Sequence, residues 1–393
     1  MRSSALPIKK VLIYKADLLH LSETFIREQV LAYAQWTALL VGMRRVPGLP
    51  LEGLDIHLLG HGGEQSALAA AYERVLKRFN LPHPHFVRQL QSAGAALAHI
   101  HFGTEAVEFW PIARRLGLPV IVTLHGYDIT VHKEIWECGA AGASKARYPH
   151  RLIAMARSPH TYFIAVSKAI RQCAIDFGIP AERIFVHYIG IDCALFKPGG
   201  LPVAQRRRRI LYVGRLVEKK GVGVLIEAYA RVFDKVADAE LVIVGDGPLR
   251  QQLEALACRL AVPAVFAGSM GSEAVKQQLD AARVFCLPSI TAENGDAEGF
   301  GLVLLEAQAC GVPVVTSARG GAHEGIIDGV TGLAFAEKDI AVLTQQLITL
   351  LTDDDCISRM SQAGPCFVAK NFDVRDCTRS LEGLYDDVVR AAA

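Results

Sequence analysis

The sequence predicts an α/β protein with two doubly wound domains in tandem. Its 393 residues exceed one ordinary domain of about 100–200 residues and suit two. Hydrophobic residues make up 51% of the chain and charged residues 21%, which supplies enough apolar side chains for two cores. Short apolar segments alternate with helical patterns along both halves. This alternation is typical of parallel sheets covered by helices on both faces.

In the first half, helical patterns separate short strand-like segments. A helix is expected over Glu23–Ala34, with Ser22 at its N-cap and apolar side chains at helical spacing. The expected strands are Val11–Tyr14, Ala98–Phe102, Val120–Leu124, Tyr162–Val166 and Ile184–Tyr188.

Proline and glycine mark a boundary in the middle of the chain. Lys197–Pro202 has the composition of a linker, and Arg206–Arg209 is interpreted as a solvated charge run. We therefore place the first domain at residues 1–200 and the second at residues 201–372. The expected strands of the second domain are Ile210–Val213, Leu241–Val244, Val265–Ala267, Val284–Leu287 and Val314–Thr316, and its helices are Val224–Phe233, Leu249–Arg259, Glu273–Ala281 and Leu302–Ala309.

Charge is unevenly distributed between the halves. Residues 1–200 hold 22 Lys and Arg against 15 Asp and Glu, a net charge of +7, and residues 201–393 hold 20 against 25, a net charge of −5. The basic half suits an anionic lipid, substrate or nucleic acid, although scattered charges can simply solvate a surface. Nine cysteines without C-x-x-C spacing indicate neither a zinc site nor disulfides, so a cytosolic setting is expected. Neither a signal peptide nor a membrane-spanning segment is indicated.

A turn with two cations follows the strand Ile210–Val213. Arg215 and Lys220 stand five residues apart, between Gly214 and Gly221. Both side chains can reach one anion, and the glycines allow close approach to the free N–H groups that begin the next helix. The pattern indicates a phosphate site; the alternative is a solvated basic turn.

An acidic pair frames the predicted helix Leu302–Ala309. Glu298 precedes Gly299-Phe-Gly301, and Glu306 lies about two turns along the helix. Carboxylates accept hydrogen bonds from vicinal hydroxyls, and the glycines permit a tight turn that exposes amides. These residues suit a sugar or a phosphate, unless Glu298 is a helix-start charge and Glu306 a surface residue.

His125 follows directly after the strand Val120–Leu124, in His125-Gly-Tyr-Asp128. Ligands of open parallel sheets bind beyond the carboxyl ends of the strands, where this imidazole is expected. A structural histidine satisfied by local hydrogen bonds is the alternative.

Together these motifs resemble the retaining glycosyltransferases of family 4, whose GT-B fold places two Rossmann-like domains around a central cleft. The resemblance covers nearly the whole chain and is strongest over residues 184–335. It implies that residues 373–393 form a helix that crosses back to the first domain. Further matching elements are Ala165-Val-Ser-Lys168, Gly190-Ile-Asp192, Val244-Gly-Asp-Gly-Pro248, Leu287-Pro-Ser289, Gly311–Thr316 and Gly320-Gly321.

The resemblance implies a role for each matching residue. The expected donor contacts are Arg215, Lys220, Gly301 and Leu302 for the diphosphate, Glu298, Phe300 and Glu306 for the sugar and ribose, and Gly245, Gly247 and Gly268 for the nucleobase. His125 is expected to contact the donor sugar, and Asp128 to orient His125 or the acceptor. The catalytic set is then His125, Arg215, Lys220 and Glu298. The resemblance also implies that the leaving phosphate helps to deprotonate the acceptor hydroxyl, so no protein nucleophile is expected.

The first strand-to-helix loop departs from the family pattern. Many relatives carry a Gly-Gly pair there, close to the diphosphate, whereas this chain has Leu19-His-Leu-Ser-Glu-Thr-Phe25. The loop resembles a branch of the family involved in bacterial exopolysaccharide assembly. The hydroxyls of Ser22 and Thr24 are expected to replace the missing amide contacts to the diphosphate, and both residues are placed on the acceptor side of the site together with Asp128.

Other classes of protein fit the sequence less well. A dehydrogenase would need G-x-G-x-x-G, but position 250 is arginine in the Gly245 motif. Asp353-Asp-Asp355 matches a metal-binding D-x-D pattern but is better placed as a helix N-cap. A nucleic-acid binder would interleave aromatic residues with its basic run. A catalytically silent sugar-nucleotide-binding or scaffold protein of the same fold stays open.

The resemblance thus implies a retaining hexosyltransferase that uses a UDP- or GDP-sugar, and we expect neither a cofactor nor a metal. The acceptor is expected to be a saccharide, in particular a lipid-linked one, and no nucleic acid partner is expected. Tyr72–Arg78 and Lys145–Arg157 combine basic and apolar residues that could dock on an anionic membrane. The expected location is the cytoplasm, peripheral on the inner face of the membrane.

Overall fold

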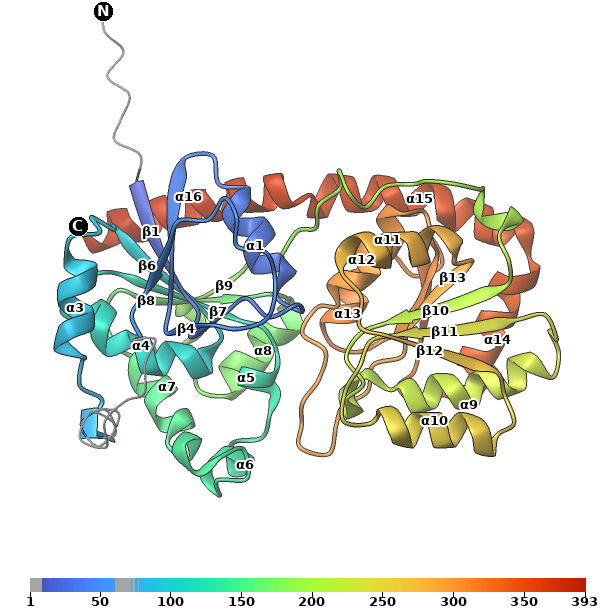
Figure 1. Ribbon diagram of the computed structural model, residues 1–393, viewed down its shortest axis with the longest axis horizontal. Coiled ribbons are helices and arrows are strands. Elements are labelled where there is room, and N and C mark those ends of the chain that lie inside the picture. Colours follow the sequence, from blue (N-terminus) through green and yellow to red (C-terminus); the bar gives the residue numbers. More distant parts are fainter. Residues whose placement is uncertain (1–8, 61–71, 73–74, 77) are drawn as a thin grey trace, which may run out of the picture. The chain divides into compact units, whose positions relative to one another are not determined.

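The computed structural model describes all residues except 1–8, 61–71, 73–74 and 77, and the chain forms two compact units (Figure 1). Unit 1 comprises residues 1–166, 170–188 and 374–393, and unit 2 comprises residues 167–169 and 189–373. The chain passes from unit 1 to unit 2 between Tyr188 and Ile189, ahead of the expected boundary at residue 200. Ile191 already belongs to unit 2, because its amide donates a hydrogen bond to the carbonyl of Phe372 (2.9 Å).

Unit 1 is built on a seven-stranded parallel sheet. Apolar residues of the inner strand β1, such as Val11 and Ile13, are fully buried, as expected for a sheet with helices on both faces. In spatial order the strands are β5 (Ile56–Leu58), β3 (Trp36–Gly42), β1 (Lys9–Tyr14), β6 (Leu97–His101), β7 (Val120–Leu124), β8 (Thr161–Ala165) and β9 (Ile184–Val186). The short strands β2 (Asp17–Leu18) and β4 (Arg44–Arg45) pair beside it.

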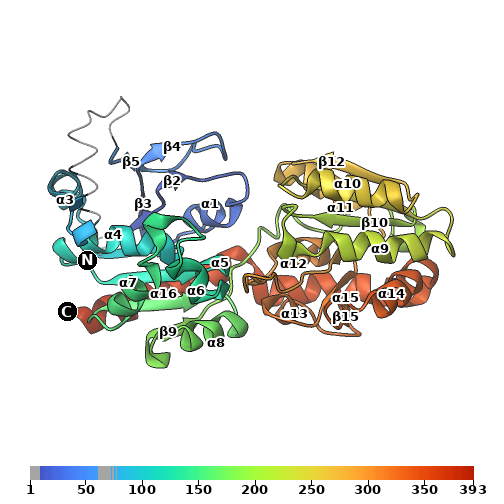
Figure 2. The same ribbon diagram turned by 90° about the horizontal axis from the view of Figure 1, so that it is seen from below.

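Helices connect the strands of unit 1, seen from below in Figure 2. They are α1 (Thr24–Leu31), α3 (Pro84–Gln91), α4 (Gly103–Arg115), α5 (Tyr127–Thr130), α6 (Lys133–Glu137), α7 (Tyr148–Ala156) and α8 (Lys168–Asp176). The expected N-cap at Ser22 is wrong, because α1 has Glu23 at that position. The Glu23 carboxylate instead accepts a hydrogen bond from the amide of His20 (2.9 Å), so it stabilises the preceding turn.

Unit 2 repeats the doubly wound arrangement with six parallel strands. Their order is β12 (Ala264–Gly268), β11 (Glu240–Val244), β10 (Arg209–Val213), β13 (Val284–Leu287), β14 (Val314–Ser317) and β15 (Gly332–Phe335). The helices are α9 (Val222–Phe233), α10 (Arg250–Arg259), α11 (Ser272–Ala281), α12 (Leu302–Ala309), α13 (Gly321–Glu324), α14 (Ile340–Thr352) and α15 (Asp354–Phe372). Asp353 caps α15 by accepting a hydrogen bond from the amide of Cys356 (2.8 Å), which confirms the expected N-cap.

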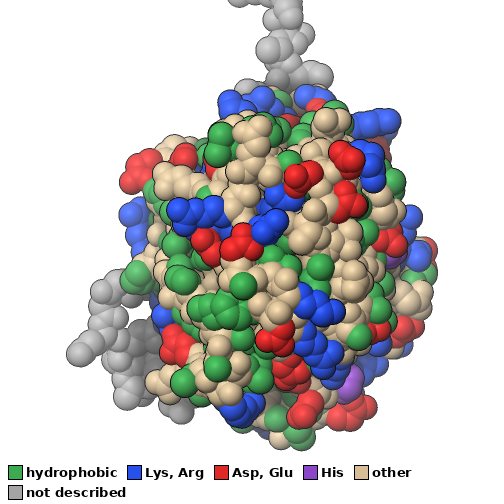
Figure 3. All heavy atoms as spheres, turned by 90° about the vertical axis from the view of Figure 1, so that its right-hand side faces the viewer, with side chains coloured by type: hydrophobic (Ala, Val, Ile, Leu, Met, Phe, Trp, Pro, Cys, Tyr) green, Lys and Arg blue, Asp and Glu red, His purple; other side chains and the backbone are tan. Residues whose placement is uncertain are grey.

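The run Arg206–Arg209 is only partly solvated, which corrects the sequence interpretation. Arg206 is 8% exposed, and its guanidinium donates to backbone carbonyls of Leu201, Leu279 and Ala282. Arg207 is exposed and Arg208 half-buried, and both form ion pairs, Arg207 with Glu240 and Arg208 with Asp238. Figure 3 shows a face of unit 2 on which basic and acidic side chains are interspersed, so no single-sign patch gathers there.

The last helix, α16 (Val374–Ala392), belongs to unit 1. Its Glu382 is fully buried, and one carboxylate oxygen accepts hydrogen bonds from three successive amides, those of residues 34, 35 and 36 (2.7–2.9 Å). Tyr385 hydrogen-bonds His99 and packs edge-on against Trp36, with ring centroids 5.3 Å apart. These long-range contacts fix the carboxyl-terminal helix against the sheet that begins the chain.

We expect Glu382→Ala to lower the free energy of unfolding of unit 1 by about 2 kcal/mol, because buried amides would lose their acceptor. Urea titration followed by tryptophan fluorescence measures this loss. Glu382→Gln keeps an acceptor oxygen and should lose less, and Asp387→Ala, exposed on the same helix, should change little. Equal stability of Glu382→Ala and Asp387→Ala would contradict the anchoring role.

Among the described residues, no helix is long and apolar enough to cross a lipid bilayer. The nine cysteines are all free thiols.

Candidate functional site

In unit 2, the candidate residues gather beyond the carboxyl ends of β10 and β13. The sheet extends in opposite directions from these two neighbouring strands, and ligands of open α/β sheets bind at such a switch point. Gly221 holds the turn after β10 against the loop after β13: its φ is +63°, and a Cβ there would lie 1.9 Å from the carbonyl oxygen of Pro288. Only glycine permits this close approach.

An ion pair joins the two segments. Lys220 bonds Glu298 through its Nζ, and the two side chains are 15% and 11% exposed. The neighbouring Lys219 pairs with Asp296 at 2.9 Å. Ser289 lies 3.4 Å from the same Glu298 oxygen. The predicted residues Lys220 and Glu298 are therefore in direct contact.

The electrostatics of this pair favour its charged form. Burial alone would raise the pKa of the Glu298 carboxyl, but the positive charges of Lys220 and Lys219 outweigh it and leave the pKa below its usual range. Arg215 is exposed, and among the described residues no carboxylate pairs with its guanidinium. The turn thus offers Arg215, which no carboxylate of the described chain pairs, and two lysines, Lys219 and Lys220, whose charges are each shared with a carboxylate.

The start of α12 presents backbone amides beside this pair. Gly301 is its N-cap with φ +81°, a left-handed conformation that favours glycine, and Leu302 is the first helical residue. Phe300 is 4% exposed and packs against Phe372, with ring centroids 5.5 Å apart. The side chain of Phe300 therefore belongs to the core, and only its backbone can serve a ligand.

Glu306 lies on α12 without a partner for its carboxylate among the described residues. Burial raises the pKa of this carboxyl to about 7. A carboxylate in such surroundings is costly unless it is hydrogen-bonded. The unpartnered group is therefore an acceptor ready for the donors of a ligand.

The three predicted nucleobase residues lie at the ends of β11 and β12. The amide of Gly245 donates a hydrogen bond to the carbonyl of Gly268 (2.8 Å). A Cβ at Gly245 would lie 1.9 Å from the carbonyl oxygen of Gly214, and one at Gly247 would lie 2.5 Å from that of Leu216. The strand ends of β10, β11 and β12 thus approach one another closely because glycine occupies these positions.

In unit 1, His125 lies at the end of β7 among aromatic rings. Its Nε2 is 3.1 Å from Nδ1 of His101, and its ring packs against Phe25 and Phe102, with centroids 4.8 and 4.4 Å away. Burial, with smaller contributions from the charges of His99 and Lys15, lowers the pKa of His125 to about 3. The imidazole is therefore neutral at physiological pH and offers a hydrogen bond, not a charge.

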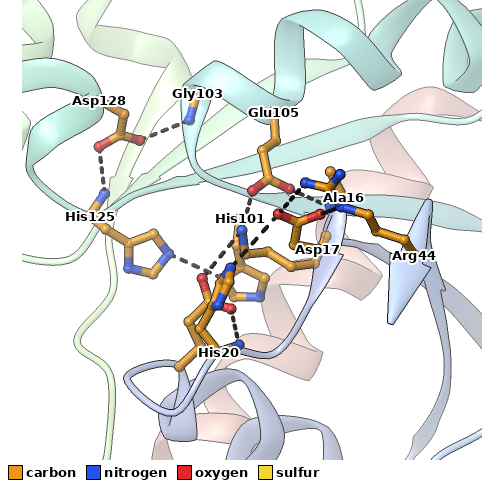
Figure 4. A network of polar contacts seen from close by, with 11 residues as sticks. Ala16, Asp17, His20, Arg44, His101, Gly103, Glu105, His125 and Asp128 are labelled. Carbon is orange, nitrogen blue, oxygen red and sulfur yellow. Dashed lines mark hydrogen bonds and ion pairs between the residues drawn. The ribbon is translucent and has the colours of Figure 1, made fainter. Parts of the chain in front are cut away.

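Asp128 fixes the backbone that carries His125. Its carboxylate is fully buried and accepts hydrogen bonds from the amides of Gly103, His125 and Gly126, at 2.8, 3.1 and 3.0 Å (Figure 4). All these bonds hold loop backbone. The contacts favour orientation of His125 over direct contact with an acceptor.

A second polar network lies behind the first loop of unit 1. Lys15, the residue after β1, pairs with Glu105 of α4 and with Glu23 (3.2 Å), and Glu105 also accepts from the amide of Ala16 (2.7 Å). Figure 4 shows Glu105 reaching from its helix to this loop. Burial would lower the pKa of Lys15, but both carboxylates raise it overall, so the lysine stays charged.

The loop also contains the residues expected to face the acceptor. Ser22 is exposed and Thr24, half-buried, opens α1. Asp17 receives two bonds from Arg44, at 2.6 and 3.1 Å, and lies 3.8 Å from the imidazole of His20. Ion pairs, and the hydrogen bond from the His20 amide to the Glu23 carboxylate, therefore fix this loop, which lacks the Gly-Gly pair of many relatives.

Comparisons with known proteins identify the family of this chain. Residues 197–365 match the family described as Glycosyl transferases group 1, and residues 46–195 match Glycosyltransferase Family 4. A GDP-mannose-dependent α-(1-6)-phosphatidylinositol monomannoside mannosyltransferase of Mycolicibacterium smegmatis is 31% identical over 67% of this chain and 69% of that protein. The chain belongs to glycosyltransferase family 4. The amylovoran biosynthesis glycosyltransferase AmsK of Erwinia amylovora is 34% identical over 58% of this chain, a match that spans only about half (54%) of AmsK.

Solved structures confirm the GT-B fold of this family 4 protein. HepE of Anabaena, solved with UDP and glucose, superimposes with a TM-score of 0.77 at 20% identity, over 96% of this chain and 99% of that one. The lipopolysaccharide biosynthesis glycosyltransferase WaaG gives a TM-score of 0.69 at 18% identity, over 96% and 99%.

Within this family 4 chain, sequence reasoning missed the carboxylates that organise unit 1. These carboxylates, Glu23 and Glu105, lie in no local motif. The one sequence feature that pointed to them was their partner Lys15, a lysine directly after the first strand. No group of three or more His, Cys, Asp or Glu side chains in the described part of the chain could hold a metal ion. That catalysis proceeds without one stays a prediction.

Proposed function

We propose that this chain is a retaining glycosyltransferase that moves a hexose from a UDP- or GDP-sugar to a hydroxyl of a saccharide acceptor. The acceptor is lipid-linked, and the product enters a bacterial exopolysaccharide or another cell-surface glycan. The contact between Lys220 and Glu298, with the exposed guanidinium of Arg215 on the same turn, carries this proposal. It joins a site for an anion to a carboxylate suited to sugar hydroxyls.

Donor binding follows from the chemistry of unit 2. Arg215 and Lys220 neutralise the diphosphate, and the amides at the start of α12 add hydrogen bonds to it. Glu298 accepts hydrogen bonds from sugar hydroxyls once Lys220 turns to phosphate. The unpartnered carboxylate of Glu306 accepts from the two ribose hydroxyls.

The transfer step breaks the bond between the anomeric carbon and the leaving phosphate oxygen. Arg215 and Lys220 stabilise the negative charge that accumulates on that phosphate. The acceptor oxygen forms the new bond on the same face of the sugar, and its proton passes to the leaving phosphate. His125, neutral because of its low pKa, contacts the donor sugar as a hydrogen-bonding group.

The named relatives support the substrate classes. The mycobacterial relative is named as GDP-mannose-dependent and acts on a phosphatidylinositol mannoside. AmsK and the putative colanic acid glycosyltransferase WcaL of Escherichia coli are named for exopolysaccharide synthesis. HepE was solved with UDP-glucose, so the fold accommodates either base.

A donor panel tests the proposal. UDP, GDP and ADP, with their common sugar conjugates, are added without metal, and melting temperature and slow donor hydrolysis are measured. We expect one nucleotide to raise the melting temperature selectively and its sugar conjugate to be hydrolysed. NMR of the transfer product should show the anomeric configuration of the donor. Binding without hydrolysis or transfer would favour a silent sugar-nucleotide-binding protein, and no binding at millimolar concentration would contradict the donor site.

A further inference from the structure

Unit 1 contains a cavity of about 460 Å³ that the donor chemistry does not use. It lies beside α4, which packs against both α3 and α7 (Figure 1). Its volume is within the range of about 300–1,000 Å³ that small-molecule sites occupy. The cavity reaches the carboxyl end of β1 at Tyr14, the edge of the sheet where ligands of this architecture bind.

The interior of the cavity is apolar. Leu59, Leu76, Phe86, Val107 and Ile112 line it and are each less than 9% exposed. They come from the residue after β5, from the segment before α3, and from α3 and α4. Such a lining excludes water and suits hydrocarbon, since each apolar surface gains by contact with another.

The mouth of the cavity is cationic. Arg78, Arg147 and Arg151 line it, against a single acid, Glu108, among the described lining residues. Arg151 donates a hydrogen bond to the carbonyl of Arg78 (3.4 Å), so these segments meet at the mouth. No carboxylate of the described chain pairs with Arg78 or Arg147.

Two of the arginines stand close together at the start of one helix. Arg147 is the N-cap of α7, and Arg151 lies four residues on, so two like charges share the positive end of a helix. Burial, and then the charge of Arg147, lower the pKa of Arg151, and the negative charge of Glu108 opposes them only in part. An anion at the mouth would relieve both effects and would receive planar, bidentate hydrogen bonds from the guanidinium groups.

The geometry points to a binding site for an amphiphile with a phosphate head and a hydrocarbon tail, the tail in the apolar cavity and the phosphate on Arg78, Arg147 and Arg151. Exposed apolar side chains continue the interior outward: Leu81 at the mouth is 52% exposed, and Phe79 beside it is 65% exposed. The occupant we assign is the lipid phosphate part of the acceptor. This assignment rests on the proposed function, and it names what recognises the lipid.

Decyl phosphate, kept below its micelle concentration, is the probe, and binding is measured by calorimetry on the full chain without any nucleotide. Butyl phosphate has the same phosphate head with a short tail, and decyl glucoside has the same tail with an uncharged head. We expect saturable binding of decyl phosphate and much weaker binding of the other two. Arg147→Ala should weaken decyl phosphate binding about 10-fold through loss of a charged hydrogen-bond donor.

Two further variants obstruct the mouth of the cavity by different means. Ser144→Trp places a ring in the mouth, and Leu81→Glu adds a negative charge to it; both residues line the cavity. Each should abolish decyl phosphate binding, and either suffices if the other fails to fold. Arg157→Ala is the matched control, because Arg157 is exposed at the opposite end of α7 and should leave binding unchanged.

Several outcomes would overturn the inference. The first is equal binding of decyl phosphate and decyl glucoside, and the second is unchanged decyl phosphate binding in Arg147→Ala. The third is that Arg147→Ala no longer floats with anionic vesicles but still binds decyl phosphate, which would indicate a membrane-docking surface. Nucleotide binding, measured in parallel, keeps the two proposals distinct. Binding of decyl phosphate without binding of any nucleotide would support the cavity site and contradict the proposed donor site. Binding of a nucleotide without binding of decyl phosphate would contradict only the cavity site.

Discussion

Replacement of Lys220 by alanine is expected to lower kcat/KM for the nucleotide sugar by about 1,000-fold, because one cation that offsets charge on the leaving phosphate is lost. Most of the loss should fall on kcat. Arg215 remains on the same turn and can hold part of the ground-state charge. Initial rates over a range of donor concentrations separate kcat from KM.

The same substitution should also lower stability. Glu298 would remain buried without its partner, and breaking a buried ion pair costs about 3 kcal/mol. Without Lys220, burial dominates and the pKa of Glu298 rises from its present low value. The penalty should therefore be largest at neutral pH and fade in acid, where the carboxyl is protonated.

A double variant tests this cause. Lys220→Ala with Glu298→Gln should recover most of the lost stability but none of the activity. Lys235→Ala, exposed after α9, is the control and should match the wild type in both. Recovery of activity in the double variant would show that Lys220 serves only to compensate Glu298.

Local patterns predicted much of the fold. The strands β7 and β13 and the helix α12 have the predicted bounds, because each is a short apolar run between strong turn signals. Strand β3, Trp36–Gly42, was missed although its last four residues are buried. It follows α1 after a short turn, and the helical pattern of Glu23–Ala34 obscured where the helix ends. Helix α1 in fact ends at Leu31.

Side-chain partners far apart in sequence were beyond prediction. Arg206 reads as one of four solvated arginines, yet it bonds carbonyls more than 70 residues away. Lys15 and Glu105 are 90 residues apart, and only the parallel pairing of β1 with β6 brings them together. In contrast, Lys220 and Glu298 were predicted as one donor site, because the resemblance to family 4 joins their two motifs, and the structure places both beyond neighbouring strands at the switch point of the sheet.

Replacement of Glu306 by glutamine should change nucleotide affinity and stability in opposite directions. An ionised carboxylate that accepts both ribose hydroxyls contributes about 3 kcal/mol, so the variant should bind the nucleotide about 100-fold more weakly at pH 8. Burial raises the pKa of Glu306 to about 7 from an ordinary value of 4.5, so ionisation of this carboxyl lowers the free energy of unfolding of the ligand-free protein. Glutamine removes that charge, and the variant should therefore be the more stable of the two.

The pH dependence gives the sign of this effect. Between pH 4.5 and about 7 the folded chain keeps a proton on Glu306 that the unfolded chain has lost, so wild-type stability falls as pH rises through this window. The Glu306→Gln variant lacks this loss. The two proteins should be equally stable near pH 4, and the variant should exceed the wild type by about 3 kcal/mol at pH 8.

Nucleotide affinity should follow the opposite course. The wild type should bind more tightly as pH rises through 7, because ionised Glu306 is the better acceptor for hydroxyl donors. Titration of the diphosphate affects both proteins alike, so the ratio of their dissociation constants isolates Glu306. Asp355→Asn, exposed on α15, serves as the charge control for stability. A ratio that does not change between pH 6 and 8 would remove Glu306 from the ribose site, whatever its effect on stability.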